Sequence, residues 1–187
     1  MGVGRDHLNA LYAGTSDPWD FAHSDYEQAK FAATRAALSR PRYTSAFELG
    51  CGNGQLARHL VKICDRYTGM DAVAIAIEAA RKAVPEAHFI CDFYPCPLPT
   101  GDFDLLILSE ILYFLDHDTL TKLASEISTA WPHADVLCVS WLGETDHDLQ
   151  GEEALETFAR ALATHYFDCI AQTDGYRIDR GLPRGQA

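Results

Sequence analysis

The sequence is poor in positive charge: its 187 residues include 15 Lys and Arg against 27 Asp and Glu, a formal net charge of −12. A phosphate backbone or an anionic membrane surface attracts clustered basic residues, so the composition argues against both partners. No apolar run reaches the ~18 residues that a membrane-spanning helix needs. The first residues also form no apolar signal segment, and we therefore expect a cytoplasmic protein.

The sequence also lacks cysteines and histidines at the spacings that are typical of metal sites or of a disulfide-linked fold. None of its six cysteines forms a Cys-x-x-Cys pair or stands at zinc-ligand spacing from a histidine. Asp146, His147 and Asp148 are adjacent, but no other ligand set is spaced to complete a metal site with them. We expect no metal ion, and cysteines that pack as small apolar side chains in a reducing compartment.

What the sequence does contain is an alternation of short β-branched or aromatic runs with longer helical stretches, which is typical of βαβ units. The expected fold class is α/β, with a doubly wound, mainly parallel sheet of about seven strands. The segments 166–172 and 176–179 are expected to pair antiparallel at the sheet edge. Strands are predicted over 44–49, 67–70, 87–91, 103–108 and 135–140, and helices up to residue 12 and over 24–38, 55–64, 74–84, 118–131 and 152–164.

The clearest local signal is the glycine loop Gly50-Cys51-Gly52-Asn53-Gly54 after the first predicted strand. Glycines adopt positive φ and allow close approach of a ligand, and a strand–loop–helix unit places backbone N–H groups at a ligand site. The third glycine comes one residue earlier than in the dinucleotide fingerprint Gly-x-Gly-x-x-Gly, and Glu48 precedes the first glycine by two residues. Taken alone, the segment is also compatible with a plain tight turn.

The pattern from Glu48 to Gly54 resembles the nucleotide-binding motif of class I S-adenosylmethionine-dependent methyltransferases. The resemblance implies that Asp71, at the end of the second strand, accepts hydrogen bonds from both ribose hydroxyls, which one carboxylate can do. It also implies that Asp92 accepts a hydrogen bond from the adenine amino group and that Phe93 packs on the ring.

The same resemblance implies a larger set of cofactor contacts. Ser109 follows the fourth strand, where such enzymes line the methionine part of the cofactor and begin the acceptor pocket. Trp19 and Tyr26 are expected either to fold over the cofactor as a lid or to pack the front helices on the core. The predicted cofactor-binding residues are Trp19, Tyr26, Glu48, Gly50, Cys51, Gly52, Gly54, Met70, Asp71, Ala72, Asp92, Phe93 and Ser109.

A narrower resemblance is to the nodulation protein S type of N-methyltransferase, which methylates the free amine of a deacetylated chitooligosaccharide. It implies S-adenosyl-L-methionine as cofactor and a small amine acceptor, such as an amino sugar. It also implies a helical cap over residues 1–43 and a cofactor-binding core over 44–187. The motifs are Asp17-Pro18-Trp19, Ser24-x-Tyr26-Glu27-x-x-Lys30, Arg42-Tyr43, Ser109-Glu110-x-Leu112-Tyr113 and Gly151-Glu152-Glu153-Ala154.

Three side chains are candidates for handling the acceptor's proton: Glu110, Tyr113 and His147. Glu110 can hold a cationic amine or accept its proton, or it is a surface carboxylate. Tyr113 is expected to be a pocket wall, and His147, in the loop after the fifth strand, can shuttle a proton near neutral pH. Lys30 can meet the methionine carboxylate of the cofactor or remain solvated.

Two other functions stay open at this point. A nicotinamide-dependent oxidoreductase shares the strand–glycine–helix unit and the acidic residue after the second strand, although the glycine spacing disfavours it. A non-catalytic module that binds the cofactor as a sensor is excluded by no feature of the sequence. The sequence leaves the oligomeric state open.

Overall fold

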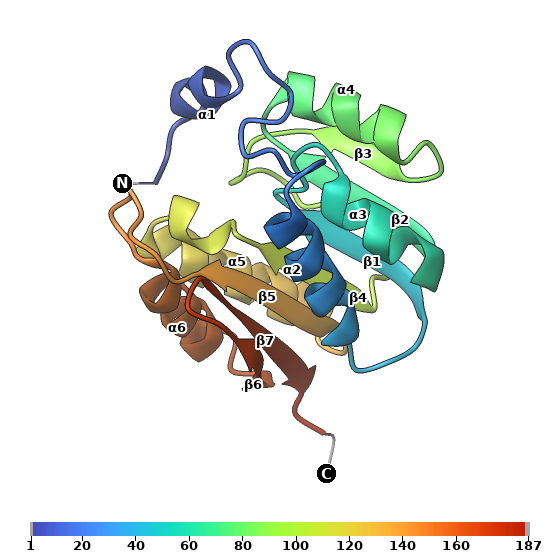
Figure 1. Ribbon diagram of the computed structural model, residues 1–187. Helices are drawn as coiled ribbons and strands as arrows, with labels where there is room; N and C mark the ends of the chain where they lie inside the picture. Colours follow the sequence, from blue (N-terminus) through green and yellow to red (C-terminus); the bar gives the residue numbers. More distant parts are fainter. Residues whose placement is uncertain (1, 186–187) are drawn as a thin grey trace.

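Seven strands form one sheet in the order β3-β2-β1-β4-β5-β7-β6 in the computed structural model of the protein, which describes residues 2–185 (Figure 1). The strands are β1 (Tyr43–Leu49), β2 (Cys64–Asp71), β3 (His88–Cys91), β4 (Leu105–Ser109), β5 (Asp135–Trp141), β6 (His165–Gln172) and β7 (Tyr176–Pro183). The α-helices are α1 (Arg5–Leu11), α2 (Asp25–Ala36), α3 (Gln55–Leu60), α4 (Ala74–Ala83), α5 (His117–Ala130) and α6 (Gly151–Ala161). Two 3₁₀ turns, η1 (Val61–Ile63) and η2 (Leu112–Phe114), complete the set.

The strand directions confirm the predicted fold class. β1 pairs in parallel with β2 and β4, and β2–β3 and β4–β5 are parallel as well. β7 runs antiparallel between β5 and β6, so the predicted antiparallel pair at the sheet edge is confirmed. The order along the sheet reverses between β1 and β4, and ligands of such sheets bind at the carboxyl ends of the strands beside this reversal.

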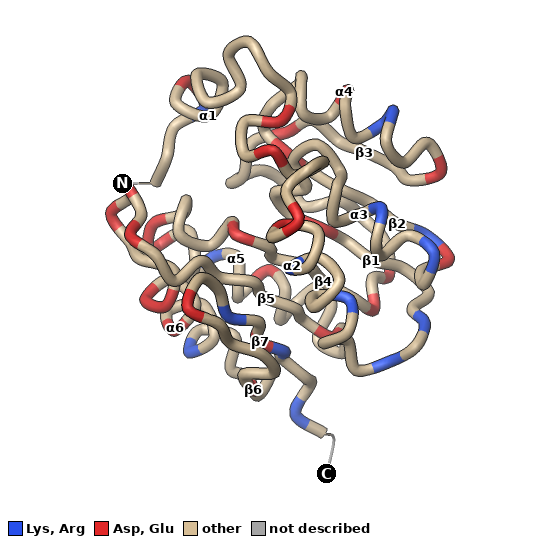
Figure 2. The backbone as a smooth tube through the Cα atoms, in the orientation of Figure 1, with Lys and Arg blue, Asp and Glu red and all other residues tan. Residues whose placement is uncertain are grey.

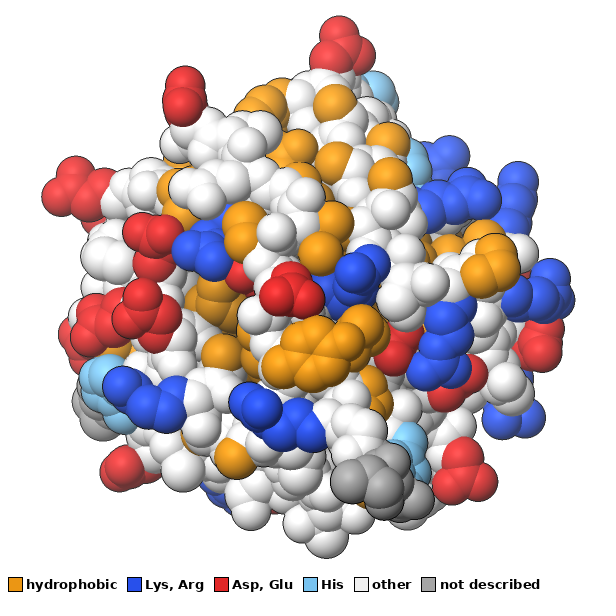
Figure 3. All heavy atoms as spheres, turned by 90° about the horizontal axis from the view of Figure 1, so that it is seen from below, with side chains coloured by type: hydrophobic (Ala, Val, Ile, Leu, Met, Phe, Trp, Pro, Cys, Tyr) orange, Lys and Arg blue, Asp and Glu red, His pale blue; other side chains and the backbone are white. Residues whose placement is uncertain are grey.

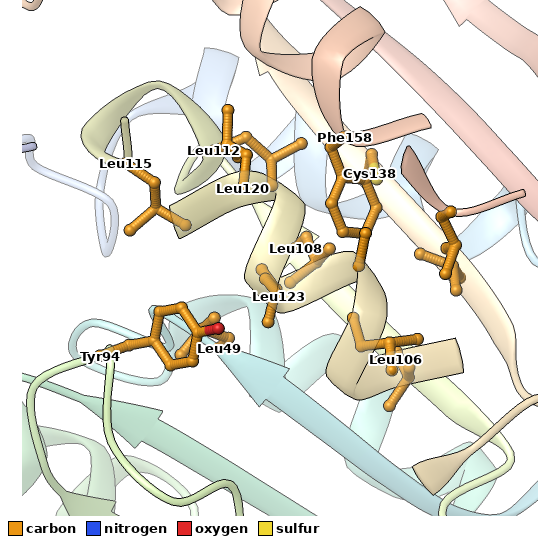
Figure 4. Close-up of a cluster of buried hydrophobic side chains, with 14 of the residues drawn as sticks. Leu49, Tyr94, Leu106, Leu108, Leu112, Leu115, Leu120, Leu123, Cys138 and Phe158 are labelled. Carbon is orange, nitrogen blue, oxygen red and sulfur yellow. The ribbon is translucent and has the colours of Figure 1, made fainter. Parts of the chain in front are cut away.

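Helices cover both faces of the sheet because the central strands are apolar on both sides. Leu106 and Leu108 of β4 belong to the cluster under α5 and α6, whereas Leu105 and Ile107 belong to the cluster under α2, α3 and α4. In Figure 4, Leu120 and Leu123 of α5 lie over the first pair. Successive side chains of a strand point to opposite faces, so four consecutive residues of β4 contribute to both halves of the core.

Several predicted boundaries are wrong, and strand pairing explains two of them. The helix predicted to reach residue 64 ends earlier, because Cys64 pairs with Tyr43 at the start of β1 and already belongs to β2. The last strand, predicted to end at residue 179, continues to Pro183, because β6 offers partners as far as His165. Long-range pairing therefore overrides the local periodicity at these ends.

The charges are unevenly distributed over the molecule. Asp and Glu gather on the left of Figure 2, near the N-terminus and α1, whereas most Lys and Arg lie on the right and at the bottom. In the view from below in Figure 3, basic and acidic side chains are more mixed, and an apolar patch lies near the centre. Among helices within residues 2–185, none has the length and apolar character needed to cross a membrane.

Candidate functional site

A cavity of about 570 Å³ lies at the carboxyl ends of β1, β2, β3 and β4. Its volume is within the range of about 300–1,000 Å³ that is typical of small-molecule sites. Strand ends form one wall, and α1, the loop after it and the loop after β5 form the others. All predicted site residues line this cavity except Tyr26 and Gly54.

The glycine loop bends sharply past the cavity. Gly50, Gly52 and Gly54 have φ values of +77°, +50° and +77°, which disfavour any residue with a Cβ atom. A Cβ at Gly54 would also lie 3.0 Å from Cα of Ala80 on α4. Gly54 therefore allows α3 to pack closely against α4. Gly50 and Gly52 leave this part of the cavity free of side chains.

The N–H groups of Gly50, Cys51 and Gly52 bond within the protein, whereas the sequence predicts that N–H groups of this loop face a ligand. The N–H groups of Gly50 and Cys51 both donate to the carbonyl oxygen of Met70, at 2.8 and 3.1 Å. That of Gly52 donates to Oδ2 of Asp71 at 2.9 Å. The loop thus ties the ends of β1 and β2 together and presents bare backbone to the cavity.

Asp71 is held in place by two backbone donors. Its Oδ2 accepts from Gly52, and its Oδ1 accepts from the N–H of Val73 at 2.9 Å. Burial raises the pKa of the carboxyl, and the backbone hydrogen bonds oppose that rise. Each carboxylate oxygen has a second lone pair, so Asp71 can accept two further hydrogen bonds from a ligand. This arrangement fits a vicinal diol.

Glu48 lies deeper, beneath the glycine loop. Only 2% of the residue is exposed, and its Oε2 accepts a hydrogen bond from the hydroxyl of Tyr67 at 2.7 Å. Burial raises the pKa of Glu48 to about 8, although the Tyr67 hydrogen bond lowers it. The carboxyl group is therefore largely neutral at pH 7 and supports the loop from below.

The far end of the cavity, at β3, is closed by α1. Asp92 accepts a hydrogen bond from the N–H of Phe93 at 2.8 Å and lies 3.8 Å from the guanidinium of Arg5. The same guanidinium lies 5.4 Å from the centre of the Phe93 ring. A carboxylate and an aromatic ring stand side by side here, which suits a flat heteroaromatic group with an amino donor.

Aromatic side chains of the N-terminal segment cover the glycine loop. Tyr12 and Trp19 pack edge to face with ring centroids 5.5 Å apart, and Trp19 stacks on Phe21 at 5.4 Å. Nδ2 of Asn53 donates to the carbonyl oxygen of Ser16 at 3.3 Å and fastens the segment to the loop. Tyr12 was missed at the level of sequence, because an aromatic residue at a helix end is usually a packing residue.

Tyr26 lies outside the cavity, so only Trp19 of the two predicted lid aromatics lines it. The Tyr26 ring packs against Tyr176 at 6.0 Å, and 44% of the residue is exposed. Nζ of Lys30, one helical turn further on, lies 5.6 Å from the ring centre on the inner side of α2. The two residues are one helical turn apart on α2, but Tyr26 is exposed and Lys30 is buried.

Lys30 is buried and paired, not solvated. Its Nζ donates to Oε1 of Glu110 at 2.7 Å and to Oε1 of Glu27 at 3.0 Å, and 2% of the residue is exposed. Burial lowers the pKa of Lys30, but the two carboxylates outweigh it and raise the pKa. Burial raises the pKa of Glu110, with Lys30 opposing. Glu110 also has a positive φ of +52°, which is uncommon for a residue with a side chain.

Tyr113 and His147 form a further wall of the cavity. Their rings stack at 5.8 Å with an interplanar angle of 18°, and Phe114 lies 4.4 Å from His147. Burial lowers the pKa of His147, which favours the neutral ring, and burial raises the pKa of Tyr113. The ring of His7 on α1 lies 6.3 Å from His147, so α1 and the loop after β5 meet at this side of the cavity.

The sequence of the chain is similar to one family of proteins. Residues 5–130 match the family model described as Nodulation protein S (NodS). A nodulation protein S of Sinorhizobium fredii is 30% identical over 122 residues, covering 61% of this chain and 55% of that protein. One of Bradyrhizobium diazoefficiens is 33% identical over 104 residues, covering 53% and 49%. The chain thus spans about half the length of the curated relatives it matches.

A solved structure of the same family also resembles the fold of this chain. The N-methyltransferase NodS from Bradyrhizobium japonicum WM9, in complex with S-adenosyl-L-homocysteine, superimposes with a TM-score of 0.81 at 18% identity, covering 97% of this chain and 99% of that one. A putative methyltransferase from Pseudomonas syringae is 31% identical, with a TM-score of 0.72 over 85% of this chain and 99% of that one. The chain therefore belongs to the nodulation protein S family.

Proposed function

We propose that the protein is an S-adenosylmethionine-dependent methyltransferase that methylates a small acceptor at an amine nitrogen. The observation that carries the proposal is the Asp71 carboxylate, fixed by two backbone N–H groups beside the glycine loop with lone pairs left for a diol. Family membership and the bound ligand of the B. japonicum protein support the same cofactor. When bound, the cofactor supplies an activated methyl group on a positively charged sulfur.

In this proposal each part of the cavity has a role that follows the order of the strands. Asp92 and Phe93 after β3 would hold the adenine, and Asp71 after β2 would hold the ribose. The glycine loop after β1 lets the chain pass close to the ligand without side chains. Ser109 after β4 would line the methionine part, since β4 is the next strand of the sheet. Cys51, Met70 and Ala72 complete the lining of the cofactor site.

Residues 1–43 act in this proposal as a cap on the core formed by residues 44–187. Tyr12, Trp19 and Phe21 line the cavity and keep water from it, which strengthens electrostatic interactions inside. Alignment of the acceptor in such a closed site can lower the barrier by up to ~7–11 kcal/mol. We place the reaction in the cytoplasm, because the cysteines of the described chain are free thiols.

An amine must lose its proton before its nitrogen can attack. Glu110 is the first candidate to take it, since burial raises the pKa of this carboxyl and makes it a stronger base. His147 is the second, because its lowered pKa leaves a neutral ring that can accept a proton. Tyr113 serves as a wall of the acceptor pocket. An amino sugar is the acceptor that the family resemblance favours.

Isothermal titration with S-adenosyl-L-homocysteine and with NAD⁺ tests the proposal against its rivals. We expect saturable binding of the former only. Asp71→Ala should weaken it by ~1–3 kcal/mol, because the ribose hydroxyls lose a charged acceptor. Tight NAD⁺ binding without S-adenosyl-L-homocysteine binding would identify an oxidoreductase instead. Methyl transfer from labelled S-adenosylmethionine to a panel of amines then separates an enzyme from a non-catalytic module, which would bind and not turn over.

A further inference from the structure

Trp141 is an aromatic wall of the cavity to which the proposed function gives no role. It is the last residue of β5, and β4 ends beside it, because the N–H of Glu110 donates to the carbonyl oxygen of Val139 at 2.8 Å. Trp141 and Glu110 both line the cavity. Trp141 is half-buried and belongs to none of the four apolar clusters formed by the described residues. Packing of the core therefore does not account for its position.

Three glycines approach Trp141 closely. A Cβ at Gly143 would overlap Nε1 of the indole, and one at Gly175 would lie 3.3 Å from its Cζ3. A Cβ at Gly151, the first residue of α6, would overlap the carbonyl oxygen of Trp141. None of these three glycines has a positive φ, so the space beside Trp141, and not the backbone conformation, requires glycine at these positions. Backbone from two loops and from the start of α6 thus holds the indole in one place.

Tyr26 lies behind the indole, on the side away from the cavity. A Cβ at Gly175 would also overlap the hydroxyl oxygen of Tyr26, so the two aromatic residues meet at this glycine. Tyr26 does not line the cavity; its ring packs against Tyr176, which pairs with Trp141 between β5 and β7. Since 44% of Tyr26 is exposed, Trp141 separates the cavity from the surface of the protein at α2.

Contacts between chain segments bound the neighbouring sides of the same space. The N–H of Val3 donates to the carbonyl oxygen of Phe114 at 2.9 Å and ties the N-terminal segment to η2. The rings of His7 and His147 join α1 to the loop after β5. All four residues line the cavity, whose volume of about 570 Å³ must also hold the cofactor. The space next to Glu110 is therefore small and is bounded by the indole on one side.

We propose that Trp141 determines the size of the acceptor: the acceptor ends at the indole and is a single sugar ring or an amine of similar size, not an oligosaccharide. A wall that is fixed by backbone rejects a longer molecule, because the added atoms cannot be accommodated unless that backbone moves. The inference deepens the proposed function and rests on it, since it concerns the space next to the transferred methyl group.

The test measures the depth of this space with analogues of the cofactor, so it does not depend on the identity of the acceptor. A protonated tertiary nitrogen replaces the sulfonium sulfur, and its methyl group is exchanged for n-butyl, n-hexyl and n-octyl. An extended n-octyl chain reaches about as far as a disaccharide. Each analogue is titrated calorimetrically into the full-length wild type, Trp141→Ala and Trp19→Ala, which is the same change at another tryptophan of the cavity wall.

S-adenosyl-L-homocysteine is titrated into each protein first. Absence of its binding to the wild type would contradict the proposed function itself, and the size limit would fall with it. Binding of S-adenosyl-L-homocysteine together with an unexpected order of the alkyl analogues would contradict the size limit alone.

We expect the wild type to bind the n-octyl analogue at least about tenfold more weakly than the methyl analogue, because the chain meets the indole. Trp141→Ala should bind the two within about threefold of each other, and Trp19→Ala should keep the wild-type ratio even where it weakens both. Equal affinities in the wild type, or the wild-type ratio in Trp141→Ala, would overturn the proposal. If Trp141→Ala fails to fold, Trp141→Leu keeps an apolar side chain and removes the outer ring; an unchanged ratio in that variant would overturn the proposal equally.

Discussion

Replacing Glu48 with glutamine should make the protein more stable at neutral and alkaline pH. The carboxyl is buried under the glycine loop, and Tyr67 is its hydrogen-bond donor. Burial raises the pKa of Glu48 to about 8 from an ordinary value of 4.5. The glutamine side chain would have nearly the same shape, would still accept from Tyr67, and would never need to ionise.

The sign and size of the effect follow from proton linkage. Between pH 4.5 and about 8 the folded wild type binds the Glu48 proton, while the unfolded chain has released it. The stability from this group is therefore fully present below pH 4.5 and is lost as the pH rises through about 8. Over the interval from pH 4.5 to about 8, at about 1.4 kcal/mol per pH unit, the free energy of unfolding of the wild type falls by at most roughly 5 kcal/mol because of this group.

Urea unfolding at several pH values between about 4.5 and 8.5 measures this difference. Groups that titrate alike in both proteins cancel when the wild-type free energy of unfolding is subtracted from that of Glu48→Gln. We expect the difference to grow by several kcal/mol across the range, and the exposed control Glu156→Gln to follow the wild type. Parallel curves for wild type and Glu48→Gln would refute the assignment of a neutral, buried carboxyl.

Two other substitutions test the glycine loop and its cover. Gly54→Ala places a side chain at φ +77° and 3.0 Å from Ala80, so its free energy of unfolding should fall by ~1–2 kcal/mol or more. Gly14→Ala is the matched control, since Gly14 has a φ of +90° but open space around it; an equal loss in both would show that the Ala80 contact is unimportant. Trp19→Ala should weaken S-adenosyl-L-homocysteine binding in calorimetry with little change in stability, because 42% of Trp19 is exposed while it lines the cavity. Unchanged binding would remove Trp19 from the site.

Features that depend on residues close together in the sequence were predicted well. The continuous apolar run ending at Leu108 indicates a strand buried on both faces, and β4 is such a strand. The acidic residues Asp71 and Asp92 stand at the ends of β2 and β3, so parallel pairing brings them to one edge. The helix predicted over 24–38 starts with Ser24, a residue type typical of helix N-caps, and its Oγ accepts from the N–H of Glu27 at 3.3 Å. Each of these depends on short sequence distances and strand direction.

Features that depend on long-range contacts were not predictable. Lys30 looked like a solvated lysine because nothing near it in sequence reveals Glu110, which lies 80 residues away in the chain. The N–H groups of Gly50 and Cys51 donate to Met70 because β1 and β2 end together. Tertiary packing decides both contacts.

A crystal structure of the complex with S-adenosyl-L-homocysteine tests the central claim most directly. We predict that both ribose hydroxyls donate to the Asp71 carboxylate, that the ligand passes over Gly50 and Gly52, and that its sulfur faces the part of the cavity lined by Ser109 and Glu110. A ligand bound elsewhere, or an Asp71 side chain turned away from the ribose, would contradict the account.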